Sequence, residues 1–140
     1  MLSRLLYVSR CALRQTGADR EAHVRAMAAE AASRNAAAQL TGCLLHLDDT
    51  FVQVLEGSMV EVERIFEKIC CDFRHTEVKL IDLAPTSERI FADWSLGLLQ
   101  DPGRSASALR DQLEDVRFLA GINASEAIDQ MRRLLELQPA

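Results

Sequence analysis

Two apolar runs separated by a short polar segment dominate the hydrophobic pattern of the chain. Residues 40–47 are almost continuously apolar, residues 48–50 are small and polar, and residues 51–55 are again mostly apolar. Short polar side chains tolerate tight backbone angles, so the pattern predicts a β-hairpin. Strand side chains alternate between faces, which places Gln53 beside two apolar neighbours on one face of the second strand.

Helical periodicity marks two further segments. Residues 19–35 carry apolar side chains at i, i+3, i+4 and i+7, many of them alanines that allow close approach of a sheet or a flat ligand. Asn35 lies near the end of this segment, where asparagine is a common terminator. Residues 59–71 predict a second helix, preceded by Ser58 and Glu61 at the spacing of a capping box.

Three more strands complete the predicted sheet. They cover residues 2–9, residues 78–83, where Pro85 is expected to end the strand, and residues 94–99. The resulting order is β-α-β-β-α-β-β, which predicts an α+β, ferredoxin-like sheet with one extra strand and two helices on one face.

The remainder of the chain predicts a separate helical extension. A break at residues 101–103 precedes two amphipathic segments, residues 106–120 and 124–137. We therefore expect a domain over residues 1–100 and a helical extension over residues 101–140, packed on the free sheet face or at a subunit contact.

Composition narrows the class of protein. The 140 residues are 49% hydrophobic and 26% charged, and the net charge of −5 without a basic stripe argues against nucleic acid as a partner. Neither a signal peptide nor an apolar run of membrane-spanning length is apparent, so we expect a cytoplasmic protein without a membrane partner. Four cysteines, at positions 11, 43, 70 and 71, match no zinc spacing and predict free, buried thiols.

The sequence lacks the common enzyme motifs. It contains no Walker A, GxGxxG, HExxH or GxSxG pattern, and His23, His46 and His75 show no metal-ligand spacing. A pairing of His46 or His75 with a cysteine stays open. We therefore predict that the chain is not an enzyme and holds no metal.

Polar and aromatic residues in core-like positions carry the remaining chemistry. A buried, unpaired Gln53 amide would cost roughly 1–3 kcal/mol, so it needs a partner within the protein, solvent exposure at a sheet edge, or a polar ligand. Tyr7 is the only tyrosine, and its hydroxyl could bond to Gln53, either as an ordinary core contact or as a relay beside a redox-active ring. Asn35 and Trp94, the only tryptophan, complete the set.

Five successive blocks of the chain stand out together. They read LSRLLYVSRC, SRNAAAQLTGCLL, TFVQVLEG, CDFRH and RIFADWSLG, in this order over residues 2–99. In content and spacing they resemble the BLUF family of blue-light photoreceptors that use FAD. Each block alone is weak, but their combination is highly specific, and the family fold agrees with the predicted order of elements.

The resemblance implies a flavin between the two helices, with its ring edge towards the sheet. Tyr7 would donate an electron and a proton, and Gln53 would bridge Tyr7 and the flavin. Met27 and Ile69 would sandwich the ring, while Arg34 and Lys68 would assist with phosphates or ribose. The polar edges of the ring would be bound by Asn35, Asp72, Arg74 and His75.

The mechanism that the resemblance implies is photochemical. Light would drive electron and proton transfer from Tyr7, Gln53 would rotate or tautomerise, and the flavin absorption would move to longer wavelength. Trp94 is expected on the fifth strand, either as a signal relay that moves in or out near Gln53 or as a plain core anchor. Leu96 departs from the methionine that the family often has two residues after the tryptophan, so we expect altered recovery or signalling.

The resemblance to short BLUF proteins implies a separate downstream partner, with the C-terminal helices as relay and a homodimer as the expected assembly. One alternative is a ferredoxin-like protein-interaction module that has lost its flavin. Another is a small enzyme that acts on acyl phosphates through Asn35 and Arg74.

Overall fold

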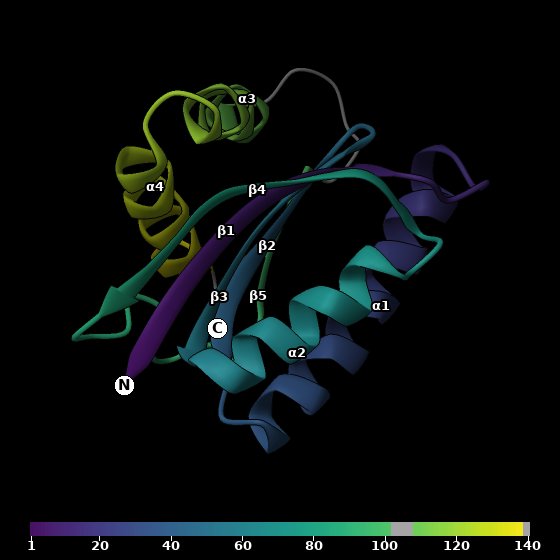
Figure 1. Ribbon diagram of the computed structural model, residues 1–140. Coiled ribbons are helices and arrows are strands. Elements are labelled where there is room, and N and C mark those ends of the chain that lie inside the picture. Colours follow the sequence, from purple (N-terminus) through teal and green to yellow (C-terminus); the bar gives the residue numbers. More distant parts are fainter. Residues whose placement is uncertain (102–107, 139–140) are drawn as a thin grey trace.

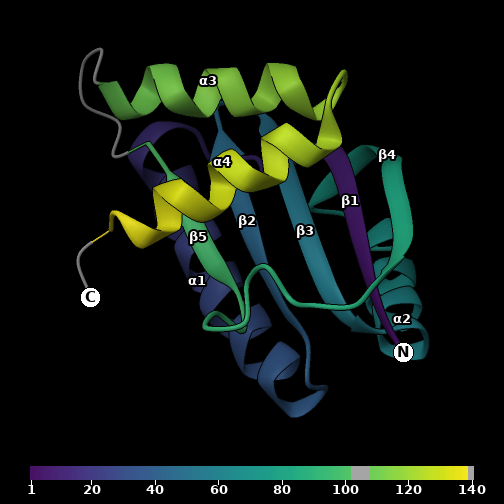
Figure 2. The same ribbon diagram turned by 90° about the vertical axis from the view of Figure 1, so that its left-hand side faces the viewer.

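The computed structural model describes residues 1–101 and 108–138, which fold into a five-stranded sheet between two pairs of helices (Figures 1 and 2). The elements along the chain are β1 (Leu2–Cys11), α1 (Gly17–Ala37), β2 (Thr41–Leu47), β3 (Thr50–Ser58), α2 (Met59–Cys70), β4 (His75–Thr86), β5 (Gly97–Gln100), α3 (Ala108–Ala120) and α4 (Ala124–Glu136).

The sheet has the order β4-β1-β3-β2-β5. Pairing is antiparallel except between β2 and β5, which run parallel. Helices α1 and α2 cover one face, and α3 and α4 cover the other (Figure 1). This arrangement confirms the predicted α+β, ferredoxin-like fold with one extra strand and two C-terminal helices.

Strand alternation in β3 assigns each side chain to one of the two helical layers. Phe51 joins the apolar cluster under α1, and Gln53 and the buried Leu55 share its face of the strand. Val52 and Val54 instead join the large cluster beneath α3 and α4. The hairpin therefore contributes side chains to two separate hydrophobic cores, one on each face of the sheet.

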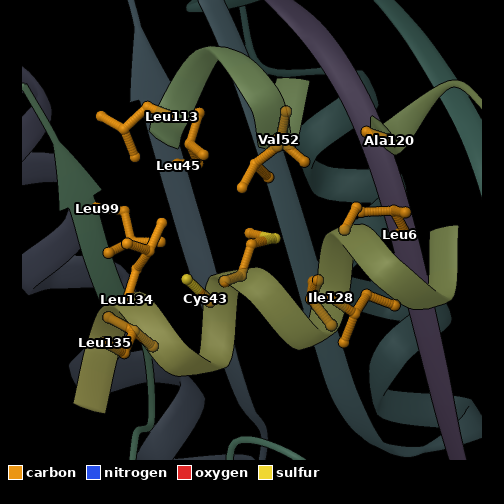
Figure 3. Close-up of a cluster of buried hydrophobic side chains, with 14 of the residues drawn as sticks. Leu6, Cys43, Leu45, Val52, Leu99, Leu113, Ala120, Ile128, Leu134 and Leu135 are labelled. Carbon is orange, nitrogen blue, oxygen red and sulfur yellow. The ribbon is translucent and has the colours of Figure 1, made fainter. Parts of the chain in front are cut away.

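The C-terminal helices bury the second face of the sheet. Side chains of β2, β3 and β5 meet those of α3 and α4 in one contiguous cluster (Figure 3). Asn123 caps α4 by accepting a hydrogen bond from the amide of Glu126 at 3.2 Å. The expected start of the first C-terminal helix at Ala106 and the break at residues 102–103 lie outside the described residues.

The two edge strands differ from their predicted bounds. Strand β4 continues through Pro85, which pairs opposite Ser3, because an edge strand needs only one side of its hydrogen-bonding ladder. Strand β5 begins only at Gly97, so the prediction that Trp94 and Leu96 belong to a strand is wrong. The backbone before Gly97 bonds elsewhere, since the Trp94 carbonyl accepts from the Gly42 amide at 3.0 Å.

Two smaller expectations are also corrected. Asn35 does not end α1, which continues to Ala37. All four cysteines are free, but Cys70 and Cys71, at the C-terminal end of α2, are exposed, and only the other two are buried. Among the described residues, no helix has both the length and the apolar character to cross a membrane.

Candidate functional site

A pocket opens between α1 and α2, above the central strands of the sheet. Its floor is made by β2 and β3, its side walls by the two helices, and one end by the segment that follows α2. The residues that line it are Met27, Ala28, Ala31, Arg34, Asn35, Leu44, Gln53, Ile65, Lys68, Ile69, Asp72, Arg74, His75 and Leu96. The structure thus gathers every residue expected to contact a flavin around one cavity.

Tyr7 and Gln53 form a buried pair beneath this pocket. They lie directly opposite each other on β1 and β3, and the Tyr7 hydroxyl donates a hydrogen bond to the Gln53 side-chain oxygen. Both side chains are buried, with exposed fractions of 0% and 5%. The amide oxygen of Gln53 therefore has a partner within the protein, while the side chain still lines the cavity.

The environment of Tyr7 keeps its phenol neutral. Burial raises the pKa of Tyr7 far above its usual range, and the nearby Cys70 and Asp72 raise it further. The hydroxyl is therefore a poor acid and stays protonated at neutral pH.

Asn35 connects the pocket to the segment that precedes β5. Its side chain is 2% exposed, and its amide nitrogen donates a hydrogen bond to the Ser95 carbonyl at 2.9 Å. The helix continues past Asn35, so this residue acts through its side chain rather than as a helix terminator. It fixes one wall of the pocket against the chain leading into β5.

An ion pair follows α2. Arg74 binds both oxygens of the Asp72 carboxylate, with its Nε donating to Oδ1 at 2.9 Å and its Nη2 to Oδ2 at 2.6 Å, and this contact lowers the pKa of Asp72. His75 approaches Phe51 with ring centroids 4.7 Å apart, and its Nδ1 lies 2.9 Å from the Ser9 hydroxyl. Burial lowers the pKa of His75 to about 4, so its imidazole is neutral at pH 7.

The side walls are apolar, and the rim is cationic. Met27 and Ile69 face the cavity from the two helices, and the small Ala28 and Ala31 leave room beside them. Arg34 and Lys68 lie at the exposed rim. A flat aromatic ring with polar edges fits this donor set, since its faces would meet the apolar walls and its edges the two amides.

Leu96 and Trp94 lie on opposite faces of the sheet. Leu96 lines the pocket, whereas Trp94 packs against the cluster under α3 and α4, 6.5 Å from the Phe91 ring centroid. Trp94 is half-buried and does not line the cavity. In this arrangement Trp94 makes a core contact, and its role as a signal relay stays a prediction.

Sequence reasoning missed two contributors to this region. Leu44 lies opposite Gln53 on β2 and lines the pocket, which the hairpin register would have indicated. Glu56 is fully buried, and the sequence feature that could have pointed to it is a charged residue directly after the apolar run of β3.

The imidazoles of His46 and His75 bond to Gln100 and Ser9, respectively, rather than to a cysteine. In the described part of the chain, no cluster of His, Cys, Asp and Glu is arranged to hold a metal ion.

The two helices over the ferredoxin-like sheet enclose an apolar slot with amide-bearing edges, which is the kind of pocket that suits a flat ring with polar edges. The chain belongs to the BLUF family, described as sensors of blue-light using FAD, whose profile matches residues 2–97. BLUF proteins are flavin-dependent photosensors, so the prediction that this region is a sensor and not an enzyme is confirmed.

Relatives with this domain include longer proteins. The photoactivated adenylate cyclase subunit beta of Euglena gracilis is 36% identical over 96 residues, which cover 68% of this chain but 11% of the relative. The corresponding subunit of Euglena longa shows the same identity and coverage. Because the chain spans about a tenth of these proteins, their cyclase activity is not transferred to it.

Solved structures resemble nearly the whole chain. The dark state of the BLUF protein BlrB superposes with a TM-score of 0.77 at 29% identity, covering 98% of this chain and 97% of BlrB. The photo-activated state of BlsA gives a TM-score of 0.75 at 26% identity, covering 100% and 99% of the two chains. Klebsiella pneumoniae BlrP1, in a structure with FMN, gives 0.65 at 26% identity, covering 97% of this chain and 34% of BlrP1.

Proposed function

We propose that the chain is a blue-light photoreceptor that holds FAD between α1 and α2 and signals by rearranging the hydrogen bonds of Gln53. The observation that carries this proposal is the buried Tyr7–Gln53 hydrogen bond at the floor of a pocket with apolar walls. Membership of the BLUF family supports a flavin at this position.

The pocket residues divide the binding task between them. Met27 and Ile69 would contact the two faces of the ring, while Asn35 and Gln53 would hydrogen-bond to its polar edge. Arg34 and Lys68, at the exposed rim, would attract phosphate groups, even though the whole chain is acidic. The remaining polar groups at the end of the slot are those of Asp72, Arg74 and His75.

The family description supports FAD, whereas the structure of BlrP1 contains FMN. Both molecules carry the same ring and a phosphate, so the ring site suits either. FAD remains our proposal, and release of the cofactor from the purified protein followed by chromatography would identify it directly.

Tyr7 and Gln53 would act as a photochemical relay. The bound flavin supplies blue-light absorption and an excited state that attracts an electron. Tyr7 would give up an electron and then its phenolic proton, and both would return to Tyr7. Gln53 would meanwhile rotate or tautomerise, so that the amide ends with different partners and the absorption moves to longer wavelength.

The output would pass through the C-terminal helices. Residues 1–100 would form the light-sensing domain and residues 101–140 the relay, whose helices α3 and α4 cover the sheet face opposite the pocket (Figure 1). We propose a homodimer that signals to a separate partner in a reducing cytoplasm, where the four free cysteines are stable. Trp94, packed beneath these helices, and Leu96, in the pocket, would link the two faces.

A visible absorption spectrum before and after blue light tests this function. We expect a flavin spectrum that shifts reversibly to the red in the wild type, and no such shift in Gln53→Ala or Tyr7→Phe. A flavin that does not respond to light would contradict the photoreceptor. A colourless protein that FAD cannot reconstitute would favour the protein-interaction module instead.

A further inference from the structure

Glu56 is a fully buried carboxylate on the same strand as Gln53. It lies three residues further along β3, so its side chain points to the face opposite the pocket. Its exposed fraction is 0%, and its charge is paired with Arg4 at 2.9 Å. Burying a charge costs much free energy unless the charge is both paired and hydrogen-bonded. The hydrogen-bond partners of Glu56 therefore indicate which part of the chain it positions.

The carboxylate accepts hydrogen bonds from the backbone of the segment between β4 and β5. Its Oε2 accepts from the Ile90 amide at 2.7 Å and from Arg4, and its Oε1 accepts from the Phe91 amide at 2.9 Å and from the Thr41 hydroxyl at 3.0 Å. Next to this cluster, Arg89 donates to the Glu56 carbonyl at 3.2 Å and to Thr41 at 3.0 Å. Both carboxylate oxygens are therefore fully used.

The segment held by Glu56 ends at the pocket. Four residues after Ile90, the Trp94 carbonyl accepts from Gly42, and the next carbonyl, that of Ser95, accepts from the pocket residue Asn35. Leu96 then enters the pocket wall. Strand β3 is thus related to this segment on both faces of the sheet. On the pocket side Gln53 and Leu96 line the same cavity, and on the other side Glu56 binds the segment directly.

We propose that Glu56 is a positioning residue that fixes residues 90–96 against the sheet and thereby controls how fast the light-adapted arrangement returns to the dark one. This inference rests on the proposed photoreceptor function. If the dark arrangement requires the hydrogen bonds between Glu56 and residues 90–91, then removing one of these bonds slows recovery. The size of the absorption shift stays unchanged, since Tyr7 and Gln53 are untouched.

Glu56→Gln is the most informative substitution because it conserves shape. A glutamine amide has one oxygen and one NH₂ group, whereas both oxygens of Glu56 accept a backbone N–H. Whichever way the amide is turned, either Ile90 or Phe91 loses its acceptor. The variant therefore releases one anchor of the segment without creating a cavity.

The experiment uses the flavin-bound full chain and two readouts. The first is the rate of dark recovery after blue light, which we expect to fall by roughly threefold to tenfold, the effect of losing about one hydrogen bond. The second is acrylamide quenching of tryptophan fluorescence, which reports on Trp94 alone because the chain has a single tryptophan. Quenching should increase in the dark state of Glu56→Gln.

Matched variants separate this role from a general loss of stability. Glu61→Gln makes the same chemical change in an exposed pair with Arg64 and should recover like the wild type. Thr41→Val removes the hydrogen bond to Glu56, together with the one that Thr41 accepts from Arg89, and should slow recovery to a smaller extent. It decides the question if Glu56→Gln fails to fold.

Wild-type recovery and wild-type quenching in Glu56→Gln would overturn the inference, as would an equal effect of Glu61→Gln. A wild-type chain that shows no light-induced shift would instead contradict the proposed function itself, so the two failures are distinguishable.

Discussion

At the scale of single residues, the pocket combines neutral hydrogen-bonding groups with a tyrosine that cannot ionise on its own. Tyr7 is buried and bonded to Gln53, and the nearby imidazole of His75 is held neutral by burial. The Tyr7–Gln53 pair suits a switch between two hydrogen-bonding arrangements of similar energy.

Leu96 provides the first prediction at this scale. It lines the pocket where a methionine would place a sulfur acceptor of similar volume. We expect Leu96→Met to bind flavin as the wild type does, but to change the dark-recovery rate by about threefold or more, as one altered polar contact would. Time-resolved absorption after a blue flash measures this, and identical recovery together with identical signalling would contradict it.

The pH dependence of stability provides the second prediction. Burial lowers the pKa of His75 from 6.5 to about 4, with Asp72 raising it and Arg74 lowering it. The unfolded chain therefore binds more protons between these values, so the stability that His75 permits is complete above pH 6.5 and is lost as the pH falls towards 4.

For the flavin-free chain we expect a loss of about 2 kcal/mol over this interval, discounted from the full shift because the ring is partly exposed. His75→Gln should show a correspondingly shallower decline in the free energy of unfolding by urea. Equal slopes for the variant and the wild type would show that His75 is not responsible.

Several residue positions followed from the sequence, and others could not. Gln53 stood out because an amide interrupts an apolar strand face, and the pocket confirms its position. Trp94 could not be placed, because its backbone bonds to Gly42 and its ring joins the core of a different helical layer. Glu56 was missed because its partners, Ile90 and Phe91, are distant in sequence.

At the scale of elements, the sheet faces follow from strand periodicity, while the strand ends depend on tertiary contacts. The hairpin and both flanking helices were predictable from local pattern and capping, as the Ser58 contact to the Glu61 amide illustrates. The start of β5 was not, since it depends on parallel pairing with β2, a long-range contact.

Packing of α4 on β5 gives the third prediction. A Cβ added at Gly97 would lie 2.6 Å from the Leu135 Cδ1, whereas one at Gly121 would meet nothing closer than 3.8 Å. We expect Gly97→Ala to lower the free energy of unfolding by roughly 1–3 kcal/mol, the usual range for overpacking. Gly121→Ala should not lower it.

Urea unfolding of both variants measures the difference. Flavin binding should persist in Gly97→Ala, because the pocket lies on the other face of the sheet. Equal stability of the two variants would show that α4 does not pack as described.

At the scale of the whole molecule, one charged turn joins the sensory sheet to the C-terminal helices. Asp48, in the β2–β3 turn, pairs with Arg110 at 2.8 Å and approaches Arg117 at 3.8 Å, both on α3. The hydrogen bond from Arg110 is the main cause of the lowered pKa of Asp48. The hairpin that carries Gln53 is thereby tied to the proposed relay.

Asp48→Asn gives the fourth prediction. Asparagine tolerates the left-handed backbone at this position (φ 54°) but removes the negative charge that pairs with Arg110 and Arg117 on α3. We expect faster amide hydrogen exchange in α3, with little change in global stability because the pairs are exposed. The absorption shift should be unaffected. Unchanged exchange in α3 would indicate that this turn does not couple the two layers.

The central claim is that light acts on the hydrogen bond between Tyr7 and Gln53. Because Tyr7 is the only tyrosine, a chain made with isotope-labelled tyrosine gives an infrared signal from this residue alone. The light-minus-dark infrared spectrum should contain label-sensitive tyrosine bands that decay with the absorption shift and vanish in Gln53→Ala. A reversible absorption shift without any label-sensitive tyrosine band would contradict the account.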